Sequence, residues 1–205
     1  GGYSEFGLGA YRAVTKVDGN YIAVPPVDPL IPDAAYPTLQ SGQGFYVRNA
    51  SETTDAVISF GEQLKTSETQ NVFRTGNISQ NQTSKIMTNL FVHNGENQIL
   101  VDGTMHLFNN EYNPNVDEQD VKKMANSSEN ISLQGNKYPL IIDRRPFATE
   151  GDSLYYLLRG LAKKQYTLQV HLSAMDAGNH EVYLNDKYRQ SAQLFNEGAT
   201  SFDFI

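Results

Sequence analysis

Short runs in which apolar and polar residues alternate recur along the chain, and turn-forming residues separate them. The most regular run covers residues 166–173, where Tyr, Leu, Val and Leu alternate with Thr, Gln, His and Ser. This alternation predicts a strand with one buried face and one hydrated face. The other predicted strands cover residues 11–17, 21–24, 45–48, 56–60, 85–93, 99–101, 104–108, 131–133, 140–143, 154–158, 181–185, 190–195 and 201–205. Short strands at this spacing predict an all-β fold, an antiparallel β-sandwich of jelly-roll-like type.

Turn residues and prolines divide this pattern further. Asp102 and Gly103 separate two predicted strands, so we expect a hairpin there. Residues 25–32 are dense in proline, which has no N–H to donate to a sheet. We therefore predict two parts. Residues 1–37 form an N-terminal hairpin and Pro-rich connector packed on the main domain, and residues 38–205 form the β-sandwich domain.

One stretch, residues 117–124, favours a helix. Asp117 has the residue type of an N-cap, and Asp120 would lie near the positive end of the helix dipole. Val121 and Met124 are three residues apart and would share one face. The sequence therefore predicts one short helix near residues 117–124, close to one end of the sandwich.

The composition mainly excludes partners and chemistries. The formal net charge is −7 and no basic cluster offsets it, so the chain lacks the positive footprint that a nucleic acid needs. Cysteine is absent, which excludes disulfides, thiol catalysis and Cys-ligated metals. No run of about 18 apolar residues occurs, so we expect no membrane span. The low charged fraction of 19%, with 12 Tyr and 10 Phe, suits β-sheet surfaces outside the cytoplasm.

A cluster of oxygen-bearing side chains suggests a metal. Asn113, Asn115, Asp117 and Asp120 lie close together in the sequence. Amide and carboxylate oxygens are the ligands that calcium prefers, so calcium is the one cofactor that the sequence suggests. The spacing is not that of an EF-hand, because the sixth position from Asn113 is Glu118 rather than Gly. The alternative is a polar loop that leads into the capped helix, with no cofactor.

The sequence contains no catalytic signature. The histidines lack the HxxxH or HExxH spacing of a zinc helix, and no GxSxG elbow is present. A Ser-His-Asp set or a glycosidase carboxylate pair could assemble only in three dimensions. We therefore assign no catalytic residue, and we interpret the histidines as ordinary strand residues. They are His93, His106, His171 and His180.

Tyrosines near the C-terminal end suggest a sugar-binding surface. Tyr155, Tyr183 and Tyr188, with the neighbouring Tyr156, fall in or beside predicted strands. An exposed tyrosine has a large apolar ring for a sugar to stack on and a polar hydroxyl, and the many Asn and Gln residues offer hydrogen bonds to sugar hydroxyls. The alternative is that these rings are core or rim aromatics of the sandwich.

Several short motifs occur in a fixed order over residues 38–205. They are SGQGFYVR at 41–48, similar to a "GQGFFV" strand; Phe108 with Asp117, Asp120 and Lys123, similar to "F…D…D..K"; the strands at 154–158 and 166–172; VYLND at 182–186, similar to "V.L.D"; and Phe202, Asp203 and Phe204. In this order they resemble the β-sandwich module of exported surface proteins of Bacteroidetes-type bacteria, the domain that precedes a type IX secretion sorting tail. The resemblance implies a secreted or cell-surface module with a noncatalytic accessory role, and it supplies no catalytic residues.

Pattern, composition and resemblance lead to one leading hypothesis. We expect a noncatalytic, extracellular structural or adhesive module of a larger secreted or cell-surface bacterial protein, with weak carbohydrate binding. Its expected partners are other domains of the parent protein, and glycans or a host or matrix surface. The alternative is a carbohydrate-active enzyme or lectin-like domain that uses surface carboxylates. The chain begins with Gly1 and Gly2 rather than Met, so we expect a fragment or a processed product.

Overall fold

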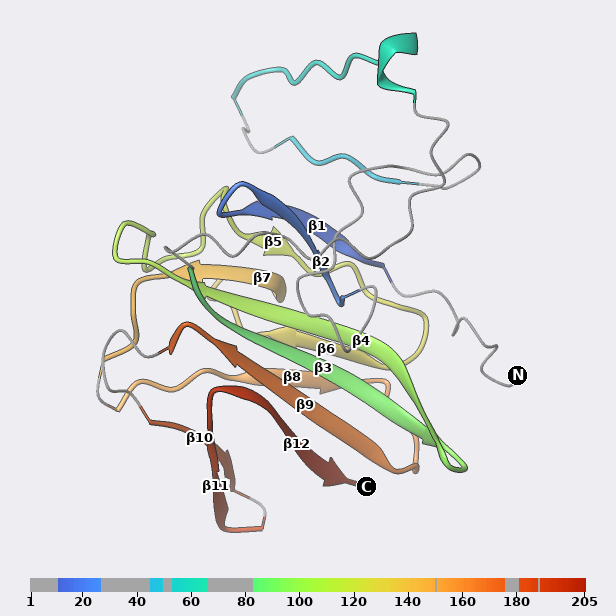
Figure 1. Ribbon diagram of the computed structural model, residues 1–205, viewed down its shortest axis with the longest axis vertical. Coiled ribbons are helices and arrows are strands. Elements are labelled where there is room, and N and C mark those ends of the chain that lie inside the picture. Colours follow the sequence, from blue (N-terminus) through green and yellow to red (C-terminus); the bar gives the residue numbers. More distant parts are fainter. Residues whose placement is uncertain are drawn as a thin grey trace.

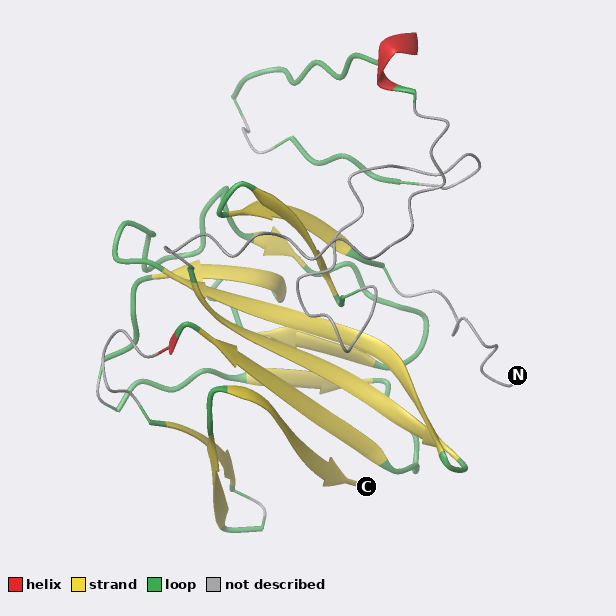
Figure 2. Cartoon of the chain, in the orientation of Figure 1, coloured by secondary structure: helices red, strands yellow, loops and turns green. Residues whose placement is uncertain are grey.

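The computed structural model describes residues 11–26, 45–49, 53–65, 83–149, 151–175, 181–187 and 189–205. These residues confirm the all-β, sandwich-like fold, because strands dominate and helix is nearly absent (Figure 2). The 3-10 helix η1 (Glu62–Leu64) is a single short turn. Within these ranges, no helix has the length and apolar character needed to cross a membrane.

Most strands belong to one eight-stranded, curled sheet (Figure 1). Its order is β12-β9-β3-β4-β7-β6-β8, and the short β5 pairs with β7. The bounds are β3 (Ser84–Asn94), β4 (Asn97–Phe108), β5 (Val121–Lys122), β6 (Asn130–Leu133), β7 (Leu140–Arg145), β8 (Tyr156–Arg159), β9 (Tyr166–Ser173) and β12 (Gly198–Phe204). Two separate hairpins flank the sheet. They are β1 (Ala13–Val17) with β2 (Asn20–Val24), and β10 (Val182–Asp186) with β11 (Ser191–Phe195).

One pair of neighbouring strands departs from the antiparallel arrangement that the sequence predicts. β4 and β7 are parallel, with Met105 beside Ile142 and Phe108 beside Arg145. A parallel pair needs a crossover connection, and residues 109–139, which include β5 and β6, provide it. Alternation along a strand is the same in both kinds of pairing, so the sequence pattern could not reveal this crossover.

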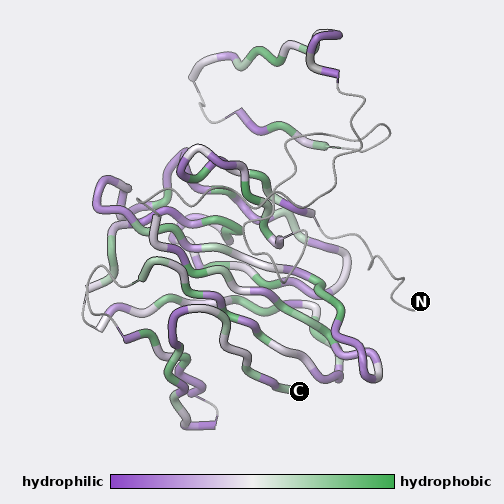
Figure 3. Tube along the Cα trace, in the orientation of Figure 1, coloured by the Kyte–Doolittle hydropathy of each residue, from purple (hydrophilic) through white to green (hydrophobic). Residues whose placement is uncertain are grey.

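The central strands are buried on both faces. Met87 of β3 belongs to a cluster with Val24 and Met105, which the β1–β2 hairpin covers. The alternating neighbours Ile86 and Leu90 point to the opposite face, where β6, β8 and the β10–β11 hairpin cover them. Figure 3 shows the hydrophobic segments concentrated along these strands and hydrophilic residues at the turn between β3 and β4. The central strands therefore lie between the β1–β2 hairpin on one face and, on the other, the β10–β11 hairpin together with β6 and β8, which belong to the curled sheet itself.

The hairpin predicted at Asp102 and Gly103 is wrong, because β4 runs through both residues without interruption. The turn comes earlier, between the end of β3 and the start of β4. Gly103 is needed for close packing. A Cβ at this position would lie 2.9 Å from Cβ of Pro25 and 2.9 Å from Oδ1 of Asn89. The glycine therefore lets the residue after β2 approach the sheet.

A buried ion pair joins β4 to the crossover connection. Lys123 Nζ donates to Asp102 Oδ1, and their side chains are 4% and 0% exposed. The carboxylate also accepts the backbone N–H of Gly103 at 2.9 Å and that of Ile131 at 2.8 Å. Burial raises the pKa of Asp102 and lowers the pKa of Lys123, while the attraction between them opposes both changes. The Asp102 carboxylate therefore joins the start of β6 to β4 through the N–H of Ile131, and Lys123 compensates its buried charge.

Residues 117–124 do not form the predicted helix. They form a turn followed by β5, in which Val121 pairs with Ile142 of β7. Asp120 closes the turn, because its carboxylate accepts the backbone N–H of Asp117 at 2.9 Å and that of Arg144 at 2.7 Å. A helix this short gains little by itself, whereas strand pairing and these two hydrogen bonds satisfy the backbone within the sheet.

Residues 45–49 and 55–60 belong to no strand, so the strands predicted at 45–48 and 56–60 are wrong. The rings of Phe45 and Phe60 are 6.2 Å apart, and the Arg48 guanidinium donates to the backbone oxygen of Asp120 at 2.8 Å. The β1–β2 hairpin packs in the cluster that contains Met87. The predicted division between residues 37 and 38 lies outside the described residues.

Candidate ligand-binding cleft

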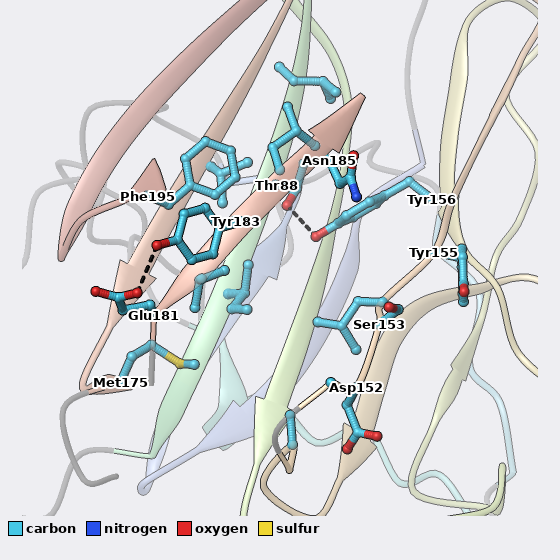
Figure 4. Close-up of a pocket in the computed structure, with 18 of the residues that line it drawn as sticks. Thr88, Asp152, Ser153, Tyr155, Tyr156, Met175, Glu181, Tyr183, Asn185 and Phe195 are labelled. Atoms are coloured by element: carbon cyan, nitrogen blue, oxygen red, sulfur yellow. Dashed lines mark hydrogen bonds between the residues drawn. The ribbon is translucent and has the colours of Figure 1, made fainter. Parts of the chain in front are cut away.

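A cleft of about 1190 Å³ opens on the sheet face that carries the β10–β11 hairpin (Figure 4). Its floor consists of side chains from β3, β4 and β9. One wall is formed by residues 147–149 and 151–156 with β8, and the other by β10. The β10–β11 hairpin is a sheet of its own and does not pair with β8. The layer that covers this face of the sheet therefore has a gap, and the cleft occupies it.

Two tyrosines predicted to bind sugar lie in the lining of this cleft. Tyr155 and Tyr183 come from opposite walls and are 53% and 52% exposed. The Tyr183 hydroxyl donates to Glu181 at 2.7 Å (Figure 4), and this hydrogen bond raises the pKa of Tyr183. Lys187 Nζ lies 6.0 Å from the ring centroid of Tyr155, a distance typical of a cation–π contact. The third predicted tyrosine, Tyr188, lies outside the described residues.

The floor of the cleft is apolar, with one polar pair. Ile86, Phe108 and Val170 line it and are almost fully buried. Among them, the hydroxyls of Thr88 and Tyr156 form a hydrogen bond of 2.9 Å. Burial raises the pKa of Tyr156, so this phenol stays protonated at neutral pH. The floor therefore offers an apolar surface with neutral hydroxyl groups.

Acidic groups outnumber basic groups in the lining. Asp152, Glu181 and Asp186 line the cleft, and Lys187 is the only cation in the lining that the structure describes. The backbone N–H of Thr149 donates to Asp152 at 2.7 Å, and the Thr149 hydroxyl does so at 3.0 Å. These hydrogen bonds lower the pKa of Asp152. The lining is therefore net acidic, which disfavours anionic ligands.

A buried histidine cluster lies beside the cleft floor, on the same face of β4 as Phe108. His106 Nδ1 donates to Asp143 at 3.0 Å, and Arg145 Nε donates to the same carboxylate at 2.7 Å. Burial lowers the pKa of His106. Burial alone would raise the pKa of Asp143, but the hydrogen bond from His106 and the nearby Arg145 lower it. The group is a neutral histidine held by an ionised carboxylate.

This cluster does not line the cleft, although its ring neighbours do. The centroid of the His106 ring lies 6.0 Å from that of Phe108 and 6.1 Å from that of Tyr156. His106 is 2% exposed, so no ligand reaches it without a rearrangement of the floor. The cluster packs against the cleft floor from the side, through the rings of Phe108 and Tyr156. The sequence pattern placed His106 on a strand but gave no signal of its carboxylate partner.

The side chains predicted to bind calcium all lie in the loop before β5. Asn113 Oδ1 accepts the backbone N–H of Asn115 at 2.9 Å, and Asp117 Oδ1 accepts that of Gln119 at 2.8 Å. With the two bonds of Asp120, these contacts account for the side chains as turn-forming groups. In the parts of the chain that the structure describes, no three His, Cys, Asp or Glu residues are grouped to hold a metal ion. Calcium binding stays a hypothesis.

The remaining histidines do not gather at the cleft. His93 Nε2 is hydrogen-bonded to Thr167 Oγ1 at 2.7 Å, and His171 lies on β9 beside Met87 of β3. His180 lies outside the described residues.

The structure brings two of the three predicted sugar-binding tyrosines, Tyr155 and Tyr183, into the lining of one cleft. It adds Glu181, Asp152 and the apolar floor, for which the sequence pattern gave no signal.

Fold and cleft together define an all-β, sandwich-like protein with an open cleft that is lined by apolar, aromatic and acidic side chains. No protein-family model, curated protein or solved structure matches the chain. Function must therefore be argued from the cleft.

Proposed function

We propose that this chain is a noncatalytic, extracellular β-sandwich module that binds carbohydrate weakly in the cleft. In this proposal it belongs to a larger secreted or cell-surface bacterial protein and has a structural or adhesive role there. The extracellular location is proposed because residues 38–205 resemble modules of exported bacterial surface proteins. Carbohydrate binding is proposed because of the side chains that line the cleft.

The observation that carries the proposal is that two half-exposed tyrosines line one cleft, from its opposite walls. Tyr155 and Tyr183 are far apart in sequence, yet both line the same cleft. Aromatic faces with neighbouring polar groups suit ligands that have both apolar C–H faces and hydroxyls. Asn185 and Asp152 lie in the same lining and offer hydrogen bonds to sugar hydroxyls.

The proposal is tested by glycan screening followed by calorimetric titration of the soluble oligosaccharides that bind. We expect Tyr155→Ala and Tyr183→Ala each to weaken binding roughly five- to tenfold, because a buried aromatic contact contributes about 1 kcal/mol or more. Tyr21→Ala is the matched control, since Tyr21 is 49% exposed on β2 and does not line the cleft. Equal affinity of all three variants and the wild type would refute the proposal, as would a screen without any bound glycan.

The acidic lining provides a direct test of the enzyme alternative. A glycosidase needs one carboxyl group with a raised pKa as general acid and a second carboxylate opposite it. The hydrogen bonds from Thr149 lower the pKa of Asp152, so Asp152 suits the role of the ionised carboxylate and not that of the general acid. Incubating the bound oligosaccharides with the protein should release no new reducing ends. Release that is lost in Glu181→Gln would favour the enzyme.

A further inference from the structure

The interior of the cleft is apolar and incompletely covered. Ile86, Phe108, Val170, Leu172 and Phe195 form a buried cluster beneath it. The side chains that pack on this cluster from the walls remain only partly buried. They are Phe147, Leu154, Met175, Val182 and Leu184. A ligand that covers these wall residues would gain about 25 cal/mol of binding free energy for each Å² of apolar surface removed from water.

The opening of the cleft has a different character from its interior. The exposed members of the lining are rings and hydrogen-bonding groups, namely Tyr155, Tyr183, Glu181, Asn185 and Asp152, whereas the apolar wall residues pack on the buried cluster beneath. Ligand pockets usually have about 300–1,000 Å³, so a cleft of about 1190 Å³ has room beyond a sugar that stacks at the rim. Such a site suits a ligand with a polar end and an apolar end.

The charge of the lining limits which polar group the ligand can carry. Three carboxylates line the cleft against one lysine, Lys187. A sugar that carries carboxylate or sulfate would meet like charge from the exposed Asp152 and Glu181, which is unfavourable. A neutral sugar has no such cost, and its hydroxyls donate to these carboxylates.

We propose that the cleft binds an amphipathic glycoside, with a neutral sugar against Tyr155 and Tyr183 and an apolar aglycone between Leu154 and Leu184. This inference rests on the proposed carbohydrate-binding function and names the ligand class. The aglycone would cover the wall residues and the floor around Ile86. The hydroxyl pair of Thr88 and Tyr156, 2.9 Å apart, is already mutually hydrogen-bonded, so an apolar group can pass it without leaving either hydroxyl without a partner.

The test compares, for each sugar separately, alkyl glycosides of increasing chain length by calorimetry below their micelle concentrations. The probes are methyl, butyl, hexyl and octyl β-glycosides of glucose, galactose, mannose and N-acetylglucosamine, with octyl triethylene glycol ether as the chain without a sugar. We expect binding to tighten roughly fourfold per added methylene, which corresponds to about 0.8 kcal/mol, until the chain fills the cleft. The octyl ether should bind more weakly than the octyl glycoside.

A variant in the apolar wall tests the position of the chain. Val182→Phe should fill part of the interior and lower the ratio of octyl to methyl affinity. Val14→Phe is the matched control, because Val14 is 54% exposed on β1 and does not line the cleft. It should keep the wild-type ratio. Loss of the ratio in both variants would contradict the proposed position.

Each other outcome separates this inference from the function on which it rests. Methyl and octyl glycosides that bind equally well would overturn the amphipathic ligand and leave the carbohydrate-binding function intact. An octyl ether that binds as tightly as the octyl glycoside would show that the sugar contributes nothing, and would overturn both. Absence of binding by every glycoside would overturn the function itself.

Discussion

Replacement of Lys123 by methionine tests the buried ion pair most directly. Lys123→Met keeps most of the side-chain volume and removes the positive charge beside Asp102, which is 0% exposed. The Asp102 carboxylate would then have only the backbone N–H groups of Gly103 and Ile131, at 2.9 and 2.8 Å. Breaking a buried pair by removing one partner costs about 3–5 kcal/mol, because the other charge stays buried without compensation.

Protonation of Asp102 sets a ceiling on this loss. At pH 7, keeping a carboxyl of ordinary pKa 3.8 protonated costs about 4.4 kcal/mol, since each of about 3.2 pH units costs about 1.36 kcal/mol. At pH 5 the same arithmetic, over about 1.2 pH units, gives about 1.6 kcal/mol. The part of the loss that comes from the unpaired charge should therefore be about 3–4.4 kcal/mol at pH 7 and no more than about 1.6 kcal/mol at pH 5. This is a large part of a typical stability of about 5–15 kcal/mol.

The sign of the pH dependence follows from the burial of Asp102. Burial already raises its pKa in the folded protein, and removal of Lys123 takes away the main influence that opposes this. In the variant, the folded state therefore binds a proton at a pH where the unfolded chain has lost it. Stability then falls as pH rises from about 3.8 toward the folded-state pKa of Asp102.

Urea unfolding at pH 5 and pH 7, followed by circular dichroism, measures both values. Lys122→Met is the matched control, because Lys122 is exposed and its Nζ lies 5.3 Å from the ring centroid of Tyr138. Its loss should stay within about 1 kcal/mol. A loss below about 1 kcal/mol for Lys123→Met at pH 7, or equal losses at both pH values, would refute the reasoning.

Three further predictions concern other parts of the fold. Burial lowers the pKa of His106, so below about pH 6.5 the unfolded chain binds a proton that folded His106 does not. The free energy of unfolding should therefore decrease by up to about 1.4 kcal/mol for each pH unit by which the pH is lowered in this range. His106→Gln should remove this pH dependence in urea unfolding. An unchanged slope would mean that His106 titrates freely. Gly103→Ala should cost about 1–3 kcal/mol, because its Cβ would meet Pro25 at 2.9 Å; wild-type stability would contradict this close approach. If residues 113–120 bind calcium, adding it at 100 times Kd to chelator-treated protein should stabilise by about 2.7 kcal/mol and raise the Tm, and Asp117→Asn should reduce the shift. An unchanged wild-type Tm would refute the site.

The candidate site shows how far pattern alone extends. The sequence indicated tyrosines that could meet a sugar, and the structure places Tyr155 and Tyr183 in one cleft. The sequence pattern gave no signal for the cleft itself, which exists because β8 and β10 do not pair. It also gave no signal for the contact between His106 and Asp143. Such contacts depend on which strands become neighbours, and a local pattern contains no information about neighbours.

The sequence by itself determined the all-β class and most of the strands, because a period of two residues is a local property of the backbone. The alternation in residues 166–173 predicts β9, which the structure confirms. The tertiary structure decided the rest. It replaced the predicted helix at 117–124 by a turn and β5, because pairing with β7 satisfies the backbone better than one isolated helical turn does. It continued β4 through Asp102 and Gly103, where both residues pair with β3 and the glycine leaves room for Pro25. Pairing and packing are long-range interactions, so only the assembled sheet could choose between local alternatives that the sequence left equally open.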